Sequence, residues 1–237
     1  MTDYIEYLHD KIQHAGLSDD EIEYSHSLYQ KLINRQYMEN GRSKTKQGIL
    51  DQLLNSAENI DNSFIEGAIS SVIIYHQIAE EWLYDLLELI RFLIDLMLYP
   101  ERIKHKSTDN LHLNGFIQEI ESSIDFDKKK EIIEYAKDVN KYRNQIAHDL
   151  LKKDSLKLIT QDAEKFSEHF TKMSKALEGT KEEPYGARES LLEKIKYYSK
   201  WSDAFEDKYK SLLTEILEDN EVKFLSQEEF DTEIDNK

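Results

Sequence analysis

The sequence predicts an all-α protein, and three observations support this. Among 237 residues there are only 7 Gly and 2 Pro, so long helices with short connections are favoured over many strands. Apolar residues recur at three- and four-residue steps in several long segments, as on one face of a helix. Charged residues make up 33% and hydrophobic residues 39%, a mixture typical of amphipathic helices in a folded protein. We expect a bundle of four to five principal helices with extra N- and C-terminal helices.

Residues 1–62 are predicted to form two or three short helices that extend the bundle at its N-terminus. The segment "SDDEIEYSHSLYQKLINRQYMEN" begins with Ser18 as a helix cap and continues with an acidic first turn. A further helix is expected after a break at Gly41.

The longest element is predicted from Ser63 to Leu98, and Pro100 ends it. Its apolar face consists of Ile65, Ile69, Val72, Ala79, Leu83, Leu86, Ile90, Leu93 and Met97. Three shorter helices should follow, and the third of them ends at Gly179. They cover about Leu111–Ile124, Asp127–Leu151 and Thr160–Leu177.

The chain beyond the break at Pro184 and Gly186 predicts one or two more helices and then a frayed acidic tail, "SQEEFDTEIDNK". We therefore divide the sequence into three parts. These are an N-terminal helical extension over 1–62, a helical bundle over 63–178, and C-terminal helices with the tail over 179–237, packed on the same domain.

Composition excludes several classes of function. There is no cysteine, so disulfides, thiol catalysis and cysteine-ligated metal are excluded. The opening residues "MTDYIEYLHDKIQH" lack the basic start and apolar run of a signal peptide. The most apolar segment, residues 86–100, contains Glu88, Arg91 and Asp95 and is too short to span a bilayer. We expect a cytoplasmic protein without a membrane passage.

The charge is strongly negative overall, with one basic window. The formal net charge is −17, which opposes indiscriminate binding to nucleic acid. Residues 127–157 nevertheless carry nine basic and six acidic residues, a local net charge of +3. The basic residues of this window are Lys128, Lys129, Lys130, Lys137, Lys141, Arg143, Lys152, Lys153 and Lys157.

An arginine interrupts the apolar face of the helix in that window. At about 100° per residue, Arg143 lies in the middle of this face. The other members of the face are Ile132, Ala136, Val139, Ile146, Ala147 and Leu150. Because a guanidinium keeps its proton, it requires an anion or a route to water when buried. Arg143 can reach solvent, pair with a buried acid, or bind a substrate phosphate.

His148 follows five residues after Arg143 and four after Asn144. Asn144 and His148 are neighbours on one side of the helix, but Arg143 and His148 are about 140° apart. They converge only if the helix ends or distorts near Ala147, or if a second molecule completes the site. Taken alone, a histidine near a helix C-terminus is more often a residue favoured by the helix dipole than a catalyst.

The stretch "RNQIAH", Arg143 to His148, resembles the arginine, polar residue, three variable positions and histidine of the HEPN superfamily. The order of helices around the motif is similar too, so the resemblance covers roughly 63–177. It implies a small helical bundle that is often a homodimer. Many members cut RNA without a metal or cofactor, as toxins paired with an antitoxin or regulatory protein, or as effectors of phage defence.

The resemblance further implies that Arg143 and His148 form a catalytic pair positioned by Asn144. In that chemistry the ribose 2′-OH attacks the adjacent phosphorus and leaves a 2′,3′-cyclic phosphate. A group that titrates near neutrality must move a proton, and a fixed cation must stabilise the phosphorane. A dimer would bring two motifs together, so that Arg143 and His148 of the same helix would not need to converge.

The sequence departs from part of the family at Leu150, where one subgroup carries a tyrosine. Control by modification of that tyrosine is therefore not expected. The family often places an acidic residue of the long helix near the motif arginine, which makes Glu80, or less favourably Glu81, the candidate partner of Arg143. His76, four residues before Glu80, is interpreted as a core histidine, and the two do not suffice for a metal.

Other residues beside the motif are candidates for weaker contacts with RNA. Tyr142 is suited to stacking on a base. Lys141, Lys152 and Lys153 are suited to phosphate contacts, although a solvated charge run is the usual explanation of such residues. No metal site or Gly-rich phosphate loop is present in the sequence.

Three hypotheses follow. The chain is a metal-independent HEPN-type endoribonuclease, a catalytically inactive helical module that binds a protein or nucleotide partner, or a structural bundle in which Arg143 pairs with a buried acid.

Overall fold

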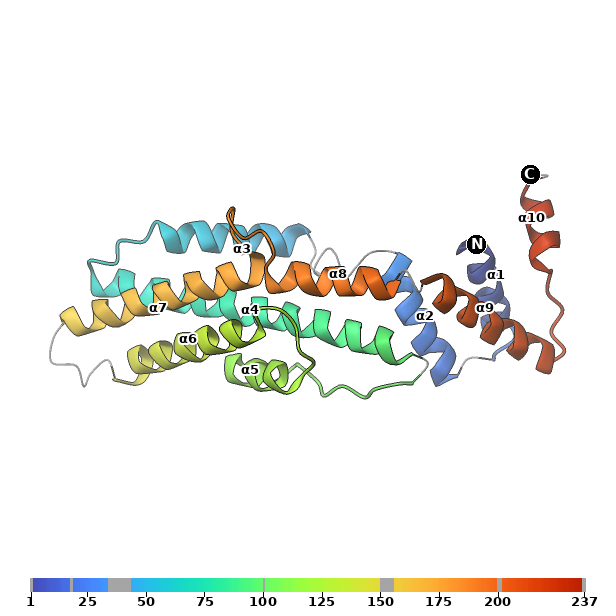
Figure 1. The fold of residues 1–237 in the computed structure, drawn as a ribbon, viewed down its shortest axis with the longest axis horizontal. Helices are drawn as coiled ribbons and strands as arrows, with labels where there is room; N and C mark the ends of the chain where they lie inside the picture. The colour runs from blue at the N-terminus through green and yellow to red at the C-terminus, as the bar shows by residue number, and fades with distance from the viewer. Residues whose placement is uncertain are drawn as a thin grey trace.

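Ten α-helices and no β-strand make up the residues described in the computed structural model, namely 2–17, 19–33, 44–99, 101–149, 156–199 and 202–235. This confirms the all-α prediction. The helices form an elongated molecule in which a long bundle is joined, at one end, to a cluster of helices from both termini (Figure 1).

The central element is α4 (Ile65–Leu98), which the periodicity predicted to within two residues at its start. It packs against α3 (Lys44–Glu58), α5 (Leu113–Ser122), α6 (Lys129–Asp149), α7 (Leu156–Glu178) and α8 (Ala187–Ser199). Six of the nine residues expected on its apolar face are buried, from Val72 to Leu93. Met97, predicted on that face, is 42% exposed instead, because it lies in the last turn of α4. Pro100 lies outside the described residues.

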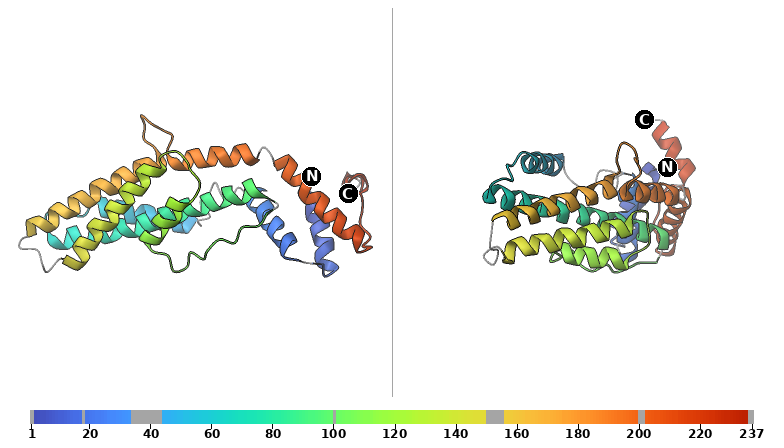
Figure 2. Two further views of the ribbon diagram at one scale, coloured as in Figure 1. Left: turned by 60° about the horizontal axis from the view of Figure 1, so that its bottom comes forward. Right: turned by 60° about the vertical axis from the view of Figure 1, so that its left-hand side comes forward.

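The helices α6 and α7 lie side by side along most of their length (Figures 1 and 2). Gly179 ends α7 as predicted, with φ +83° and its N–H donating to the Lys175 carbonyl at 2.8 Å. A Cβ at this position would lie 2.6 Å from the Pro184 carbonyl oxygen, so only glycine permits the turn. Beyond the turn, α8 continues nearly in line with α7 (Figure 2).

The two ends of the chain form the second cluster, which contains α1 (Thr2–His14), α2 (Asp20–Ile33), α9 (Ser202–Asp219) and α10 (Gln227–Asp235). The Tyr4 hydroxyl donates to the Leu225 carbonyl, and the Leu225 N–H donates to the Tyr7 hydroxyl, both at 2.9 Å. In the expected N-terminal extension, α3 packs on α4, whereas α1 packs on α9. In the C-terminal part, α8 packs on the bundle, and α9 packs mainly on α1.

The acidic tail was predicted to fray, and this prediction is wrong for its described part. Residues 227–235 form α10, and Ser226 caps this helix. The Ser226 N–H donates to Glu229 Oε2 at 2.8 Å, and the Glu229 N–H approaches the Ser226 hydroxyl at 3.4 Å. Phe230 packs against Tyr7 with ring centroids 4.9 Å apart. Capping and aromatic packing therefore order a segment whose charge alone indicated a tail.

The start of α2 also differs from expectation. Ser18, the predicted cap, and Gly41, the predicted break, lie outside the described residues. Asp19 caps α2, because its Oδ1 accepts the N–H groups of Glu21 and Ile22 at 2.9 Å each.

Candidate functional site

Arg143 lies on the face of α6 that packs toward the core, as the sequence predicted. Ile132, Ala136, Val139 and Ile146 on this face are buried, and Arg143 among them is half-buried. Ala147, expected on the same face, is exposed, because α6 there approaches its end. Leu150 lies outside the described residues.

The guanidinium of Arg143 has a hydrogen-bond partner but, among the described residues, no carboxylate partner. Its Nη1 donates to Asn144 Oδ1 at 3.0 Å, and Asn144 Nδ2 in turn approaches Asn140 Oδ1 at 3.5 Å. Within the described part of the chain, no acidic side chain forms an ion pair with it. A half-buried guanidinium has five N–H donors and a fixed charge, so the unpaired donors of Arg143 favour an external anion.

The hydrogen bond from Arg143 therefore ties the guanidinium to the side chain of Asn144 at the adjacent position. His148 is exposed near the end of α6. The helix is continuous from Lys129 to Asp149 and neither ends nor distorts before His148. The angle of about 140° between Arg143 and His148 thus persists within one chain, and a second molecule remains the way to bring the two groups together.

Glu80, the candidate partner of Arg143, is committed elsewhere. Its Oε1 accepts the N–H of Leu113, the first residue of α5, at 2.9 Å. An acidic side chain at a helix N-terminus satisfies a free N–H and interacts favourably with the helix dipole. Glu80 thus anchors α5 to α4, and the direct ion pair expected with Arg143 is not formed.

His76, which the sequence suggested was an ordinary core histidine, is half-buried on α4 and faces charged neighbours. Burial is the main cause that lowers the pKa of His76. Glu80 raises this pKa, and Arg143 and His112 lower it further. Arg143 thus affects the pKa of His76 from α6, a helix that packs against α4. Sequence spacing could not reveal this, because His76 and Arg143 lie on different helices.

Tyr142 faces α7, not the site at Arg143. Its ring stacks on His169 with centroids 5.5 Å apart, and the ammonium groups of Lys141 and Lys165 lie 5.3 and 5.9 Å from the ring centroid. His169 Nδ1 is 3.3 Å from Asp138 Oδ2, an ion-pair distance without hydrogen-bond geometry. Two ammonium groups thus meet at one ring, an arrangement favoured by cation–π attraction.

Most described lysines of the basic window are neutralised by acidic groups. Lys129 pairs with Asp125 at 3.5 Å, and Lys137 pairs with Glu121 at 2.7 Å. Lys141 has no such ion pair with a described residue. Lys152 and Lys153, the other predicted phosphate contacts, lie outside the described residues. The net charge of the window therefore overstates its attraction for RNA.

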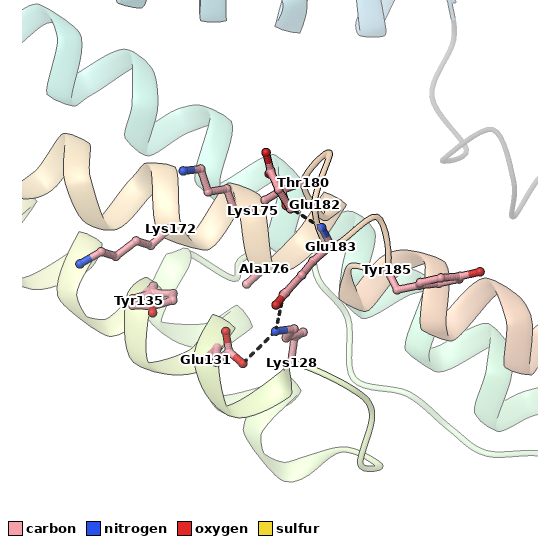
Figure 3. A pocket seen from close by; sticks show the side chains of 10 residues that line it. All are labelled: Lys128, Glu131, Tyr135, Lys172, Lys175, Ala176, Thr180, Glu182, Glu183 and Tyr185. Carbon is pink, nitrogen blue, oxygen red and sulfur yellow. Dashed lines mark hydrogen bonds and ion pairs between the residues drawn. The ribbon is translucent and has the colours of Figure 1, made fainter.

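A pocket of about 330 Å³ lies between the start of α6, the end of α7 and the connection to α8 (Figure 3). Across it, Lys128 Nζ lies 3.2 Å from Glu183 Oε2 and 3.4 Å from Glu131 Oε1. The ammonium groups of Lys172 and Lys175 point away from this cluster (Figure 3). Because two carboxylates already neutralise Lys128, and neither Arg143 nor His148 lines the pocket, we do not assign the motif chemistry to it.

Within the described ranges, none of the helices is both long enough and apolar enough to cross a membrane. No three His, Asp or Glu side chains in these ranges gather as the ligands of a metal ion would.

The resemblance to HEPN ribonucleases depends on the motif from Arg143 to His148 and on the order of the helices around it. Comparison with protein-family models, with curated proteins and with solved structures found no match to this chain.

Proposed function

We propose that this chain is a metal-independent endoribonuclease of HEPN type that acts as a homodimer in toxin–antitoxin or phage-defence systems. RNA is cleaved by attack of a ribose 2′-OH on the adjacent phosphorus. The products carry a 2′,3′-cyclic phosphate and a 5′-hydroxyl.

The observation that carries this proposal is the state of Arg143. A cation on an otherwise apolar helix face normally has a carboxylate partner or a solvated position. Arg143 is half-buried and hydrogen-bonds to Asn144 alone among the described residues. A phosphate would supply the missing acceptors, and the guanidinium would stabilise the extra negative charge of the phosphorane.

His148 supports the same proposal as the proton-transfer group. Its imidazole is solvent-exposed, and histidine is the side chain that most often serves as a general acid or base. Because an unbroken α6 directs His148 away from Arg143 of the same chain, the proposed dimer places His148 of one copy beside Arg143 of the other. This arrangement requires no distortion of the helix.

The test is incubation of the purified chain with total RNA in EDTA, with the fragment ends analysed. Arg143→Ala and His148→Ala are compared with two matched controls, one at the end of α1 and one that contacts the start of α2. These are His14→Ala, an exposed histidine paired with Asp10, and Arg102→Ala, an exposed arginine paired with Asp20. Circular dichroism of each variant establishes that it is folded.

Cleavage that leaves cyclic phosphates, is lost in both motif variants and is retained in both controls supports the nuclease. Retained cleavage in Arg143→Ala contradicts the role assigned to the guanidinium. Absence of cleavage by the wild type across several RNAs favours the binding module, in which the same unpaired guanidinium binds an anionic group of a nucleotide or protein partner.

A further inference from the structure

The helices α6 and α7, with the segment between them, escape the excess of negative charge. Residues 129–178 carry eleven basic and nine acidic residues, a net charge of +2, so the rest of the chain carries −19. An anionic partner is therefore not repelled here as it is by the chain as a whole. Because ion pairs neutralise several of these cations, the positions of the unpaired ones decide where such a partner binds.

Two unpaired ammonium groups meet at the ring of Tyr142. Lys141 on α6 and Lys165 on α7 are both exposed, and their nitrogens lie 5.3 and 5.9 Å from the ring centroid. Neither lysine forms an ion pair with an acidic residue that the structure describes. Cation–π attraction to one ring opposes the repulsion between the two charges. A phosphate that binds at this lysine pair gains two charge-assisted contacts.

An aromatic row leads from the lysine pair toward the pocket between α6, α7 and the connection to α8. The row consists of Tyr142, His169 and Tyr135, all half-buried. The ring centroid of His169 lies 5.5 Å from that of Tyr142 and 6.2 Å from that of Tyr135. Tyr135 and Tyr142 are two helical turns apart on α6, or about 10 Å, so His169 lies between them. Asp138 accompanies the imidazole, with its Oδ2 3.3 Å from His169 Nδ1.

Tyr135 also lines the pocket, whose volume is about 330 Å³. This volume lies within the range of small-ligand sites, and a nucleobase presents a flat face that stacks on an aromatic ring. Lys128 in the pocket is neutralised by Glu131 and Glu183. Lys175 is exposed, has no ion pair with a described residue, and directs its ammonium group away from Lys128 (Figure 3). The pocket thus offers an aromatic wall and one cation that is not neutralised.

We propose that the pocket and the lysine pair bind single-stranded RNA. An unpaired base lies against Tyr135, and phosphates lie at Lys175 and at the lysine pair. This inference rests on the proposed function, for which it supplies the form of the substrate. At about 3.4 Å per nucleotide of a stacked strand, the row of about 10 Å spans about three nucleotides. Because Tyr142 precedes Arg143 in α6, a strand on this row continues toward the guanidinium.

The first test measures binding of a fluorescent single-stranded 2′-O-methyl oligouridine to the full chain, by anisotropy at several salt concentrations. The methyl group blocks the attacking hydroxyl, so binding is measured without cleavage. Loss of two phosphate contacts in Lys141→Gln/Lys165→Gln should make the slope of log affinity against log salt shallower by about 1.4. The control Lys208→Gln/Lys223→Gln removes two exposed lysines of the terminal cluster and should not change the slope.

Equal slopes in the wild type and in Lys141→Gln/Lys165→Gln overturn the inference. A shallower slope in the control as well overturns it too, because the loss then reflects the charge of the whole chain. The same holds if the wild type does not bind the oligonucleotide at low salt.

The second test asks whether a base enters the pocket. Tyr135→Leu removes the ring but keeps an apolar side chain, and it should weaken binding by about 5- to 150-fold, the range for loss of one stacked base. Tyr135→Phe keeps the ring and should bind as the wild type does. The control Tyr197→Leu replaces a tyrosine of α8 that is 62% exposed and should have no effect. Circular dichroism establishes that each variant is folded.

A duplex of the same oligonucleotide should bind the wild type more weakly than the single strand, because pairing withholds the base from the pocket. This comparison does not depend on the folding of any variant. Equal affinity for the duplex, or unaltered affinity in the folded Tyr135→Leu, overturns the inference.

Cleavage of unmodified RNA separates this inference from the proposed function. The lysine pair holds phosphates away from the reacting atoms, so Lys141→Gln/Lys165→Gln should raise KM with little change in kcat. Cleavage with an unaltered KM in this variant refutes the binding site and leaves the nuclease standing. Binding of the 2′-O-methyl strand without any cleavage of RNA by the wild type refutes the nuclease and leaves the binding site standing.

Discussion

Replacement of Arg143 by leucine should stabilise the protein while abolishing its function. The guanidinium interrupts a face whose neighbours Val139 and Ile146 are 0% and 3% exposed, and it has no carboxylate partner among the described residues. Leucine restores the apolar pattern of this face and removes the positive charge. A residue kept for function at the expense of stability behaves in this way.

The magnitude follows from the burial of the site. Full burial of a leucine side chain stabilises by about 1.5–3 kcal/mol relative to an exposed one. Position 143 is half-buried, and the methylene groups of the arginine already cover some apolar surface. We therefore expect a net gain of about 0.5–1 kcal/mol in the free energy of unfolding. Ile146→Ala, on the same buried face, should instead cost about 2–5 kcal/mol.

The assay is urea unfolding of the full chain at pH 7, followed by circular dichroism, with RNA cleavage measured on the same samples. The slope of the transition should be unchanged in Arg143→Leu, so that a higher midpoint reports greater stability. A loss of about 2 kcal/mol or more in Arg143→Leu would refute the reasoning, because breaking a buried charge pair has a cost of that order. The structural bundle, in which the arginine pairs with an acid, would then be favoured.

Three further predictions concern the terminal cluster. Burial and then the neighbouring His26 lower the pKa of His9 in the folded state, so the unfolded chain binds protons first and stability should decrease as the pH falls below about 6.5. His9→Phe, which preserves the stack on His26, should weaken this decrease between pH 7.5 and 5.5 in urea unfolding; an unchanged decrease contradicts the assignment. Tyr209→Phe removes the hydrogen bond of 3.1 Å to His26 and should cost about 1 kcal/mol, whereas no change in the urea midpoint would show the bond to be without net value. Ser226→Ala should destabilise α10 locally by about 1 kcal/mol. Amide hydrogen exchange should therefore become faster in α10 but not in α4, and an equal change in both helices would contradict a local cap.

Periodicity predicted the long helices well, because each buries one face against several neighbours. The start of α4 differs by two residues from the expectation, and α6 buries the apolar residues around Arg143. The packing of the termini depends instead on contacts such as that between Tyr4 and Leu225, which are 221 residues apart. No local pattern encodes a pairing over that separation. The helix α10, by contrast, has a local signal: Ser226 and Glu229 have the three-residue spacing of a capping box. The acidic composition of the segment favoured a tail instead.

The site was predicted only in part, for a similar reason. The spacing within one helix correctly indicated that Arg143 interrupts a buried face and that Asn144 lies beside it. The acidic partner expected from α4 was wrong as a direct contact, because docking of α5 provides Glu80 with the Leu113 N–H. The effect of Arg143 on the pKa of His76, which lies on another helix, has no signal in the spacing within one helix.

The excess of negative charge is compatible with action on RNA when distance is considered. At physiological ionic strength the Debye length is about 8 Å, so acidic residues of the terminal cluster act weakly on a phosphate bound at Arg143, near the end of α6. Among the described residues near the motif, the cations are Arg143 and, at the Tyr142 ring, Lys141 and Lys165. We expect a nuclease that uses these three cations to contact few phosphates and to have little affinity for RNA in general. Cleavage then depends on how well one phosphodiester fits beside Arg143, which makes recognition local.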